Sequence, residues 1–390
     1  MDLRFWASRA VVAFLGFVVF DVTAKLLCPS AMLEQYEPRE KTLLADLVRA
    51  WKAAPQAPEI CFMGSSLMQC ALKNSSPTFL NEAPSFSWAL GGENASDSYM
   101  IAQRLMSKEK KPKLLIYGIA PRDLLDNNVK SPVSTDIFRY LSSLDSVLGL
   151  PGDAFTSVDD RVNCMLKQVS FLVDRKNVFS KAANDTAVTL ISNMVPAGPI
   201  RKSERASEQE KIAQAQAQLT APDKPGDKPK RVDHFTPAQL AAVKPTDPMA
   251  KKIAAFELLQ QISKGVTIFR YNPYCAERYN RQVVFLELLL AHLENIGVQV
   301  VVVEMPLKRE HVAIMPKALL ASYSKDVARL ATRYGASLLD FNSPEFKDSD
   351  YGDVAHLNAA GARIWQAKLV ETFKSSPYRE KLALAHQSLH

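Results

Sequence analysis

Five short apolar runs, each followed by polar or turn-forming residues, are the clearest pattern along the chain. They lie at 60–63, 86–90, 113–120, 298–304 and 337–341. Amphipathic stretches typical of helices lie beside them, at 32–54, 67–72, 95–108, 279–295, 316–334 and 359–373. Short apolar runs that alternate with helices predict a parallel sheet covered on both faces. We therefore expect an α/β domain with a flavodoxin-like, five-stranded parallel sheet.

The residues that follow the apolar runs carry most of the candidate chemistry. The first run ends in Gly64-Ser65-Ser66, and the second ends in Gly91-Gly92. In open parallel sheets, ligands bind beyond the carboxyl ends of the strands. We expect the ends of the runs to converge on that edge of the sheet.

A long segment, 131–275, interrupts this alternation. Its centre, 201–252, is rich in Lys, Gln, Ala, Pro and Asp, and this composition predicts a flexible or extended arm. The flanks, 136–195 and 250–275, are expected to form a helical cap. The predicted segments along the chain are an anchor at 1–30, a catalytic domain in two parts at 31–130 and 276–375, the insertion at 131–275 and a tail at 376–390.

The N-terminal segment Phe5–Leu27 is mostly apolar, without interruption from Ala10 to Phe20. With its flanks it reaches the ~20 residues that cross a bilayer. Arg4 and Arg9 precede the apolar core, which predicts a cytoplasmic N-terminus and a single-pass protein of the plasma (inner) membrane. The rest of the chain would then be periplasmic or otherwise extracytoplasmic. A cleaved signal peptide and a buried soluble helix are the alternatives.

Charge and cysteine content narrow the choice of partners. The formal net charge is +7, but the basic residues form no aromatic-interleaved stripe and no nucleic-acid module is recognisable. A membrane surface or an anionic polymer is the expected partner instead. No two of the five cysteines have zinc-ligand spacing, so no metal or cofactor is expected. The sequence does not choose a disulfide pair.

Ser66 is a candidate nucleophile because it follows a strand and opens a helix. The first backbone N–H groups of a helix have no partner within it, and they lie at its positive end. They can therefore stabilise an oxyanion during acyl transfer. The alternative is an ordinary N-cap serine or an anion-binding turn.

The segment Asp353-Val-Ala-His356-Leu-Asn358 is the stronger motif. An Asp three residues before a His can orient one imidazole nitrogen, which leaves the other free to accept a proton from a serine. Asn358 is expected to cap the final helix. The alternative is a capping turn with a surface histidine. Because a catalytic serine needs a base and the base needs an orienting acid, the two motifs support each other.

With these motifs the chain resembles the SGNH, or GDSL-like, hydrolase superfamily. The nucleophile block of the family matches Gly64-Ser65-Ser66, with Ser66 as nucleophile, and the last block matches Asp353 and His356. The resemblance implies that Gly91, or next to it Gly92, offers an N–H to the oxyanion hole. It covers 58–123 and 280–373, but neither the anchor nor the insertion.

The family's third block supplies an asparagine to the oxyanion hole, and this chain has none there. The corresponding segment reads Tyr117-Gly-Ile-Ala-Pro-Arg122-Asp123. Arg122 could replace the asparagine as donor, Asn94 could reach in from the second block, or the hole has two donors only. Losing one such donor costs about 10²–10³-fold in rate, so efficient hydrolysis of simple esters is not expected.

This departure, together with the anchor, is similar to a subgroup of envelope proteins that work beside membrane-bound O-acyltransferases. The resemblance implies a serine esterase or O-acyltransferase with an acyl donor and an envelope polysaccharide as substrates, and a membrane-bound O-acyltransferase as partner. From another class, the alternative is a non-catalytic SGNH-like module that binds glycan or scaffolds such an enzyme.

Overall fold

The computed structural model describes residues 15–26, 39–72, 84–175, 179–180 and 267–374. The chain divides into two compact units. The first comprises 1–49 and 131–200, and the second comprises 50–130 and 201–390. The division at 131 coincides with the predicted start of the insertion. The predicted arm at 201–252 and the tail at 376–390 lie outside the described residues.

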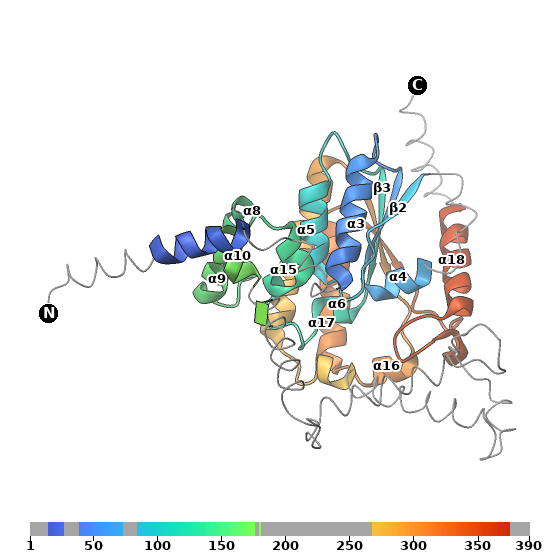
Figure 1. The fold of residues 1–390 in the computed structure, drawn as a ribbon. Helices are drawn as coiled ribbons and strands as arrows, with labels where there is room; N and C mark the ends of the chain where they lie inside the picture. Colours follow the sequence, from blue (N-terminus) through green and yellow to red (C-terminus); the bar gives the residue numbers. More distant parts are fainter. Residues whose placement is uncertain (1–14, 27–38, 73–83, 176–178, 181–266, 375–390) are drawn as a thin grey trace, which may run out of the picture. The chain divides into compact units, whose positions relative to one another are not determined.

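A wholly parallel five-stranded sheet forms the centre of the second unit (Figure 1). Its strand order, β2-β1-β3-β4-β5, is that of flavodoxin-like sheets. The prediction of an α/β fold with five parallel strands is therefore confirmed. The strands are β1 (Ile60–Gly64), β2 (Ser85–Ser87), β3 (Leu114–Ile119), β4 (Gln299–Glu304) and β5 (Ser337–Asp340).

The central strands are apolar without alternation because helices cover both of their faces. In β3 all six residues are buried, and β4 consists largely of valine, whose branched side chain suits a pleated surface. The helices in the described part of this unit are α4 (Ser66–Leu72), α5 (Ala95–Leu105), α6 (Pro121–Leu124), α15 (Ala276–Ile296), α16 (Arg309–Ala313), α17 (Lys317–Arg333) and α18 (Ala359–Lys374). Helix α3 (Arg39–Ala53) includes residues of both units, and a 3-10 turn lies at Asp348–Asp350.

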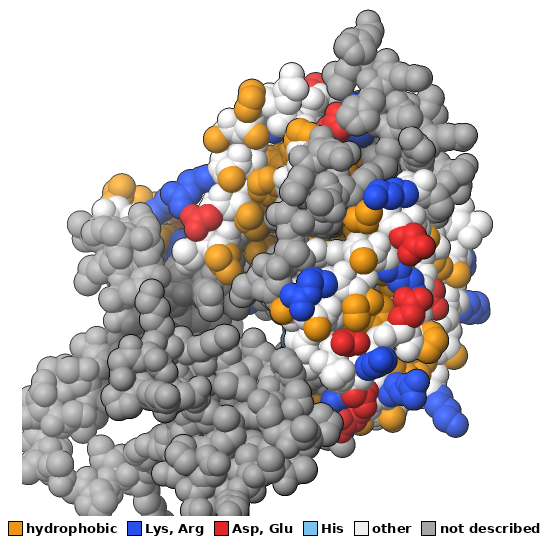
Figure 2. Space-filling view, turned by 90° about the vertical axis from the view of Figure 1, so that its right-hand side faces the viewer, with side chains coloured by type: hydrophobic (Ala, Val, Ile, Leu, Met, Phe, Trp, Pro, Cys, Tyr) orange, Lys and Arg blue, Asp and Glu red, His pale blue; other side chains and the backbone are white. Residues whose placement is uncertain are grey.

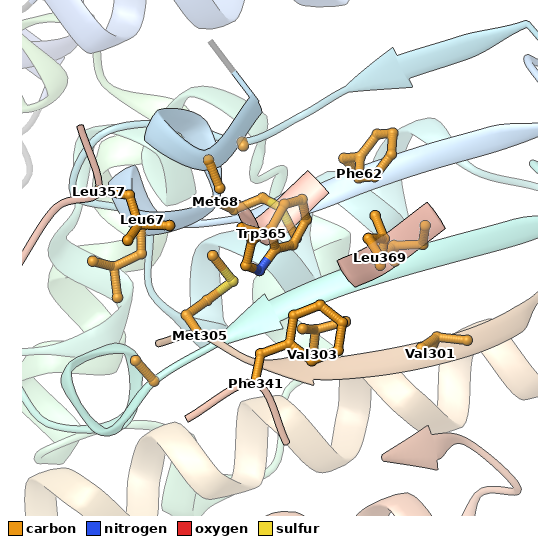
Figure 3. Packing of buried hydrophobic residues seen from close by; sticks show 14 of the residues in the cluster. Phe62, Leu67, Met68, Val301, Val303, Met305, Phe341, Leu357, Trp365 and Leu369 are labelled. Atoms are coloured by element: carbon orange, nitrogen blue, oxygen red, sulfur yellow. The ribbon is translucent and has the colours of Figure 1, made fainter. Parts of the chain in front are cut away.

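Helices α4 and α18 pack together on one face of the sheet. Figure 3 shows Trp365 and Leu369 of α18 near Phe62 and Met68 in the core of this layer. Burying each such side chain contributes about 1.5–3 kcal/mol. The packing fixes the loop that leads into α18 relative to the start of α4. On the opposite face, α5 packs on α15.

The first unit is helical in its described part. Its helices are α7 (Asp136–Leu141), α8 (Leu144–Leu148), α9 (Val158–Val169) and α10 (Phe171–Asp174), with 3-10 turns at Pro132–Ser134 and Gly152–Ala154. Residues 15–26 are also helical. Within the described ranges no helix has both the length and the apolarity needed to cross a bilayer. Residues 1–14 and 27–30 of the predicted anchor lie outside those ranges, so the anchor stays a prediction.

Two further observations bear on the sequence predictions. No disulfide joins the four cysteines in the described part of the chain, which are Cys61, Cys70, Cys164 and Cys275. On the face of the molecule that Figure 2 shows, the described lysine and arginine side chains alternate with acidic ones. The described residues of that face therefore form no single basic surface.

Candidate active site

Ser66 is the first residue of α4, two positions after β1 ends at Gly64. Gly64 has a φ of +138°, and a Cβ there would meet the carbonyl oxygen of Gly118 at 2.3 Å. Gly64 and Gly118 are paired in the β1–β3 register. Glycine is therefore required at the turn that presents Ser66, because any side chain would separate the two central strands.

Asp353 and His356 lie on a loop that closes on itself before α18. Tyr351 and Leu357 form an antiparallel bridge across it, and the N–H of Gly352 donates to the carbonyl of His356 at 2.9 Å. Asn358 ends the loop, and its Oδ1 accepts from the N–H of Ala360 at 2.9 Å. The prediction that Asn358 caps the final helix is confirmed.

The side chains of Ser66, His356 and Asp353 form one hydrogen-bonded chain. His356 Nε2 lies 2.8 Å from Ser66 Oγ, and His356 Nδ1 lies 2.8 Å from Asp353 Oδ2. An ionised carboxylate only accepts, so Nδ1 carries the proton of the neutral imidazole and Nε2 is the acceptor. The hydroxyl of Ser66 then donates to His356, which is the arrangement that a general base requires.

Several donors keep the Asp353 carboxyl ionised. Burial alone would raise the pKa of Asp353. The hydrogen bond to His356 and the electrostatic interaction with the same side chain both lower that pKa. The N–H groups of Ala355 and His356 also donate to Asp353 Oδ1, at 2.7 and 2.8 Å. The net effect lowers the pKa of Asp353 to about 2. A carboxylate that stays ionised can hold the imidazole in one tautomer and stabilise its protonated form.

The turn at Gly91 and Gly92 follows β2 and is fixed to the nucleophile strand. The N–H of Leu90 donates to the carbonyl of Gly64 at 3.1 Å, and the side-chain amide of Asn94 donates to the carbonyl of Gly92 at 3.2 Å. A Cβ at Gly91 would lie 3.9 Å from Oε1 of Gln69, a residue of α4. Asn94 thus holds the turn, and no hydrogen bond joins it to Ser66 among the described residues.

Arg122 is the donor that the structure brings to the nucleophile. It belongs to α6, directly after β3, and its side chain is buried. Its Nη1 donates to Ser66 Oγ at 3.2 Å, and its Nε lies 3.8 Å from Asp123 Oδ1. Of the two replacements considered for the missing asparagine, Arg122 is therefore the one that contacts Ser66.

Two buried carboxyls support these elements and were not predicted from the sequence. Glu93 accepts from the N–H of Leu90 at 3.2 Å and lies 2.5 Å from the hydroxyl of Ser98. Burial raises the pKa of Glu93 well above its usual range. Burial likewise raises the pKa of Asp123 to about 6, although the charge of Arg122 opposes the shift. In the part of the chain that the structure describes, neither makes a hydrogen bond to Ser66, His356 or Asp353, and no local sequence pattern singles out either residue.

A second histidine, His311 of α16, was also not selected from the sequence, because no acidic residue stands at triad spacing from it. Its Nε2 lies 2.8 Å from the hydroxyl of Tyr271. Burial lowers the pKa of His311 to about 4, and the positive charge of Arg122 adds to the shift. His311 is therefore neutral at pH 7. It is electrostatically coupled to Arg122 and His356 but makes no hydrogen bond to the triad among the described residues.

The described residues contain no cluster of three or more His, Cys, Asp or Glu side chains that could hold a metal ion. What they contain is a serine, a base and an orienting carboxylate within hydrogen-bond reach, with a buried cation beside the serine. This set of groups can activate a hydroxyl for attack on an acyl carbon.

No family model matches the chain, and no curated protein is significantly similar to it in sequence.

Proposed function

We propose that the chain is a membrane-anchored, extracytoplasmic serine esterase or O-acyltransferase of SGNH type that acts on acyl esters of a cell-envelope glycan. The hydrogen-bonded chain Ser66–His356–Asp353 carries this proposal. Its position at the carboxyl ends of parallel strands, where sheets of this kind bind ligands, supports it further.

In the proposed reaction Ser66 Oγ attacks the carbonyl carbon of an acyl ester while its proton passes to His356 Nε2. The tetrahedral intermediate collapses when His356 returns that proton to the departing alkoxide oxygen, and an acyl-Ser66 ester remains. A second hydroxyl, from water or from a glycan, then loses its proton to His356 and attacks the acyl carbon. As the bond between the acyl carbon and Ser66 Oγ breaks, His356 returns its proton to Oγ, which regenerates the serine. The acyl group leaves as a free acid or as a new ester.

The developing oxyanion requires donors aimed at the carbonyl oxygen rather than at the serine. The backbone N–H groups of Ser66 and Gly91 are the proposed donors, since the first opens a helix and the second lies in the turn beside α4. Arg122 adds positive charge next to Oγ. A guanidinium has only donors and no acceptor atom, so Arg122 stabilises negative charge and cannot compete with His356 as base.

Substitution of Ser66 provides the test, with Ser65 as the matched control. Ser65 is buried, lies one residue earlier and carries the same hydroxyl. We expect a fluorophosphonate probe to add one mass increment to the wild type and to Ser65→Ala, but none to Ser66→Ala. Turnover of a chromogenic acetyl ester should fall in Ser66→Ala, whereas Ser65→Ala should change this turnover by less than about tenfold.

Labelling of Ser66→Ala would overturn the assignment of the nucleophile. If the folded wild type shows neither labelling nor turnover but still binds envelope glycan, the non-catalytic scaffold is the correct alternative. A further measurement distinguishes acyl transfer from hydrolysis. Adding glycan acceptor to the acyl-enzyme yields acylated glycan in the first case and only free acid in the second.

A further inference from the structure

Helix α9 carries an apolar stripe that the described residues of its unit leave uncovered. Its members are Val158, Val162, Leu166 and Val169, whose side chains are between 41% and 78% exposed. Residues at this spacing share one side of a helix. An exposed apolar stripe of this kind indicates an interaction site.

The opposite side of α9 is fixed to its neighbours, so the stripe cannot rotate inward. Asp160 Oδ2 accepts from the hydroxyl of Ser131 at 2.6 Å. Gln168 Nε2 donates to the hydroxyl of Ser142 at 2.7 Å, and Cys164 is buried between these polar contacts. The outward orientation of the stripe is therefore built into the packing of this unit.

A second apolar surface in the same unit is the helix at 15–26. Its exposed large apolar side chains are Leu15, Phe17, Val18, Val19, Phe20, Val22 and Leu26. They do not lie on one side only, and a helix that is apolar around most of its circumference belongs in a buried or lipid environment.

Asp21 interrupts this apolar helix and ties it to the end of α9. Its carboxylate accepts from the hydroxyl of Ser170 at 2.8 Å, and from the N–H groups of Phe171 and Leu172 at 3.1 and 2.8 Å. Ser170 is the residue directly after α9 and the N-cap of α10. A carboxylate within an apolar segment is tolerated where it is fully hydrogen-bonded. The apolar helix and the stripe thus belong to one hydrogen-bonded assembly.

We propose that the α9 stripe (Val158, Val162, Leu166 and Val169) is a second membrane contact, lying in the interfacial region of the bilayer beside the N-terminal segment. This inference rests on the membrane anchoring in the proposed function. Helix α9 contains two acidic residues, Asp159 and Asp160, and two basic residues, Arg161 and Lys167. Its own charge therefore cancels, and the contact depends on apolar area rather than on anionic lipid.

Site-directed spin labelling of the full chain in phosphatidylcholine vesicles tests the proposal. Single cysteines are introduced as Val162→Cys, Leu166→Cys or Asn163→Cys, with Cys28, Cys70 and Cys275 replaced by serine. Asn163 is exposed, lies on the same helix and is the matched control outside the stripe. A fourth label, at Val19, reports on the apolar helix. Oxygen partitions into lipid and the nickel chelate stays in water, so a higher ratio of oxygen to nickel-chelate accessibility means that a label lies in lipid. We expect this ratio to be several-fold higher for labels at positions 162, 166 and 19 than for the label at position 163.

Three other outcomes would each overturn the proposal. If 162 and 166 match 163 while the label at 19 lies in lipid, α9 makes no membrane contact but the anchor stands. When the label at 19 is also open to the nickel chelate, the membrane anchoring itself fails. Protection of 162 and 166 from both reagents indicates that protein, from a partner or a second copy, covers the stripe instead of lipid.

Discussion

His356 and His311 both lie on segments that follow the carboxyl ends of strands in the sheet, but the surroundings of the two side chains differ. The side chain of His356 is 28% exposed and contacts the carboxylate of Asp353. His311 is 1% exposed, and its bonded partner is the neutral hydroxyl of Tyr271. Position at the active edge is therefore not enough to make a base. A carboxylate to stabilise the imidazolium and access to the serine are also required.

The largest expected effect is the difference in turnover between variants of His356 and variants of His311. His356→Ala should lower kcat/KM for an acyl ester about 10⁴-fold or more, because Ser66 loses its proton acceptor. His311→Gln should change it less than about tenfold, because His311 makes no hydrogen bond to the triad in the described residues. Steady-state kinetics of both variants test this difference. Equal losses would mean that the comparison is wrong and that His311 takes part in the chemistry.

The contribution of the carboxylate is isolated by Asp353→Asn. The amide keeps the size of the side chain but removes the charge that stabilises protonated His356. We expect a loss of about 10²–10⁴-fold in kcat with a nearly unchanged KM. Circular dichroism and the thermal midpoint serve as controls for folding. A variant with wild-type kcat would show that His356 needs no orienting acid.

Arg122 contacts Ser66, and its charge lowers the pKa of His311, so its replacement should affect both turnover and the titration of His311. Arg122→Met should reduce turnover about 10²–10³-fold, the cost of losing one donor or charge at the site of reaction. The same variant should raise the pKa of His311, because the charge of Arg122 lowers it in the wild type. Arg122→Lys is the matched control that keeps a positive charge, and NMR titration of His311 reports the shift. An unchanged His311 titration in Arg122→Met would contradict the coupling.

The smallest effect concerns stability rather than turnover. In the folded protein His311 has a pKa of about 4, whereas in the unfolded chain it has its ordinary value near 6.5. The unfolded state therefore binds more protons between these values, and folding is weakened as pH falls from 6.5 to 4. The wild type should lose about 3 kcal/mol relative to His311→Gln over this interval. Urea unfolding of both proteins at pH 7 and pH 4 measures the difference, and parallel losses would exclude His311 as the cause.

The sheet was predictable because its strands are buried on both faces and therefore contain little else than apolar residues. The predicted runs and the observed strands agree to within a residue or two at four positions. The second run is the exception, since β2 ends at Ser87 while Trp88 and Leu90 still bond to the backbone of β1. A run of apolar residues indicates that a segment is buried, but it does not show where the regular pairing between two strands ends.

The triad was predictable to different degrees. Asp353 and His356 are three residues apart, so local spacing alone indicates their contact. Choosing Ser66 over Ser65 depended on family resemblance. Arg122 was a candidate only because an asparagine was missing, and no spacing indicates its bond to Ser66. The contact of Tyr271 with His311 and that of Asp21 with Ser170 join distant segments. Such contacts depend on packing that local patterns do not encode.

The bond between His356 and Ser66 joins residues 290 positions apart, whereas the acid and the base share one short closed loop. Packing of α18 on α4 holds His356 beside Ser66 in the folded chain. During refolding, regain of turnover should therefore come after the recovery of helix signal, because loop closure over such a distance is slow. Under the proposed function, turnover would report the last step of assembly, and a chain truncated before α18 should keep Ser66 but lose turnover.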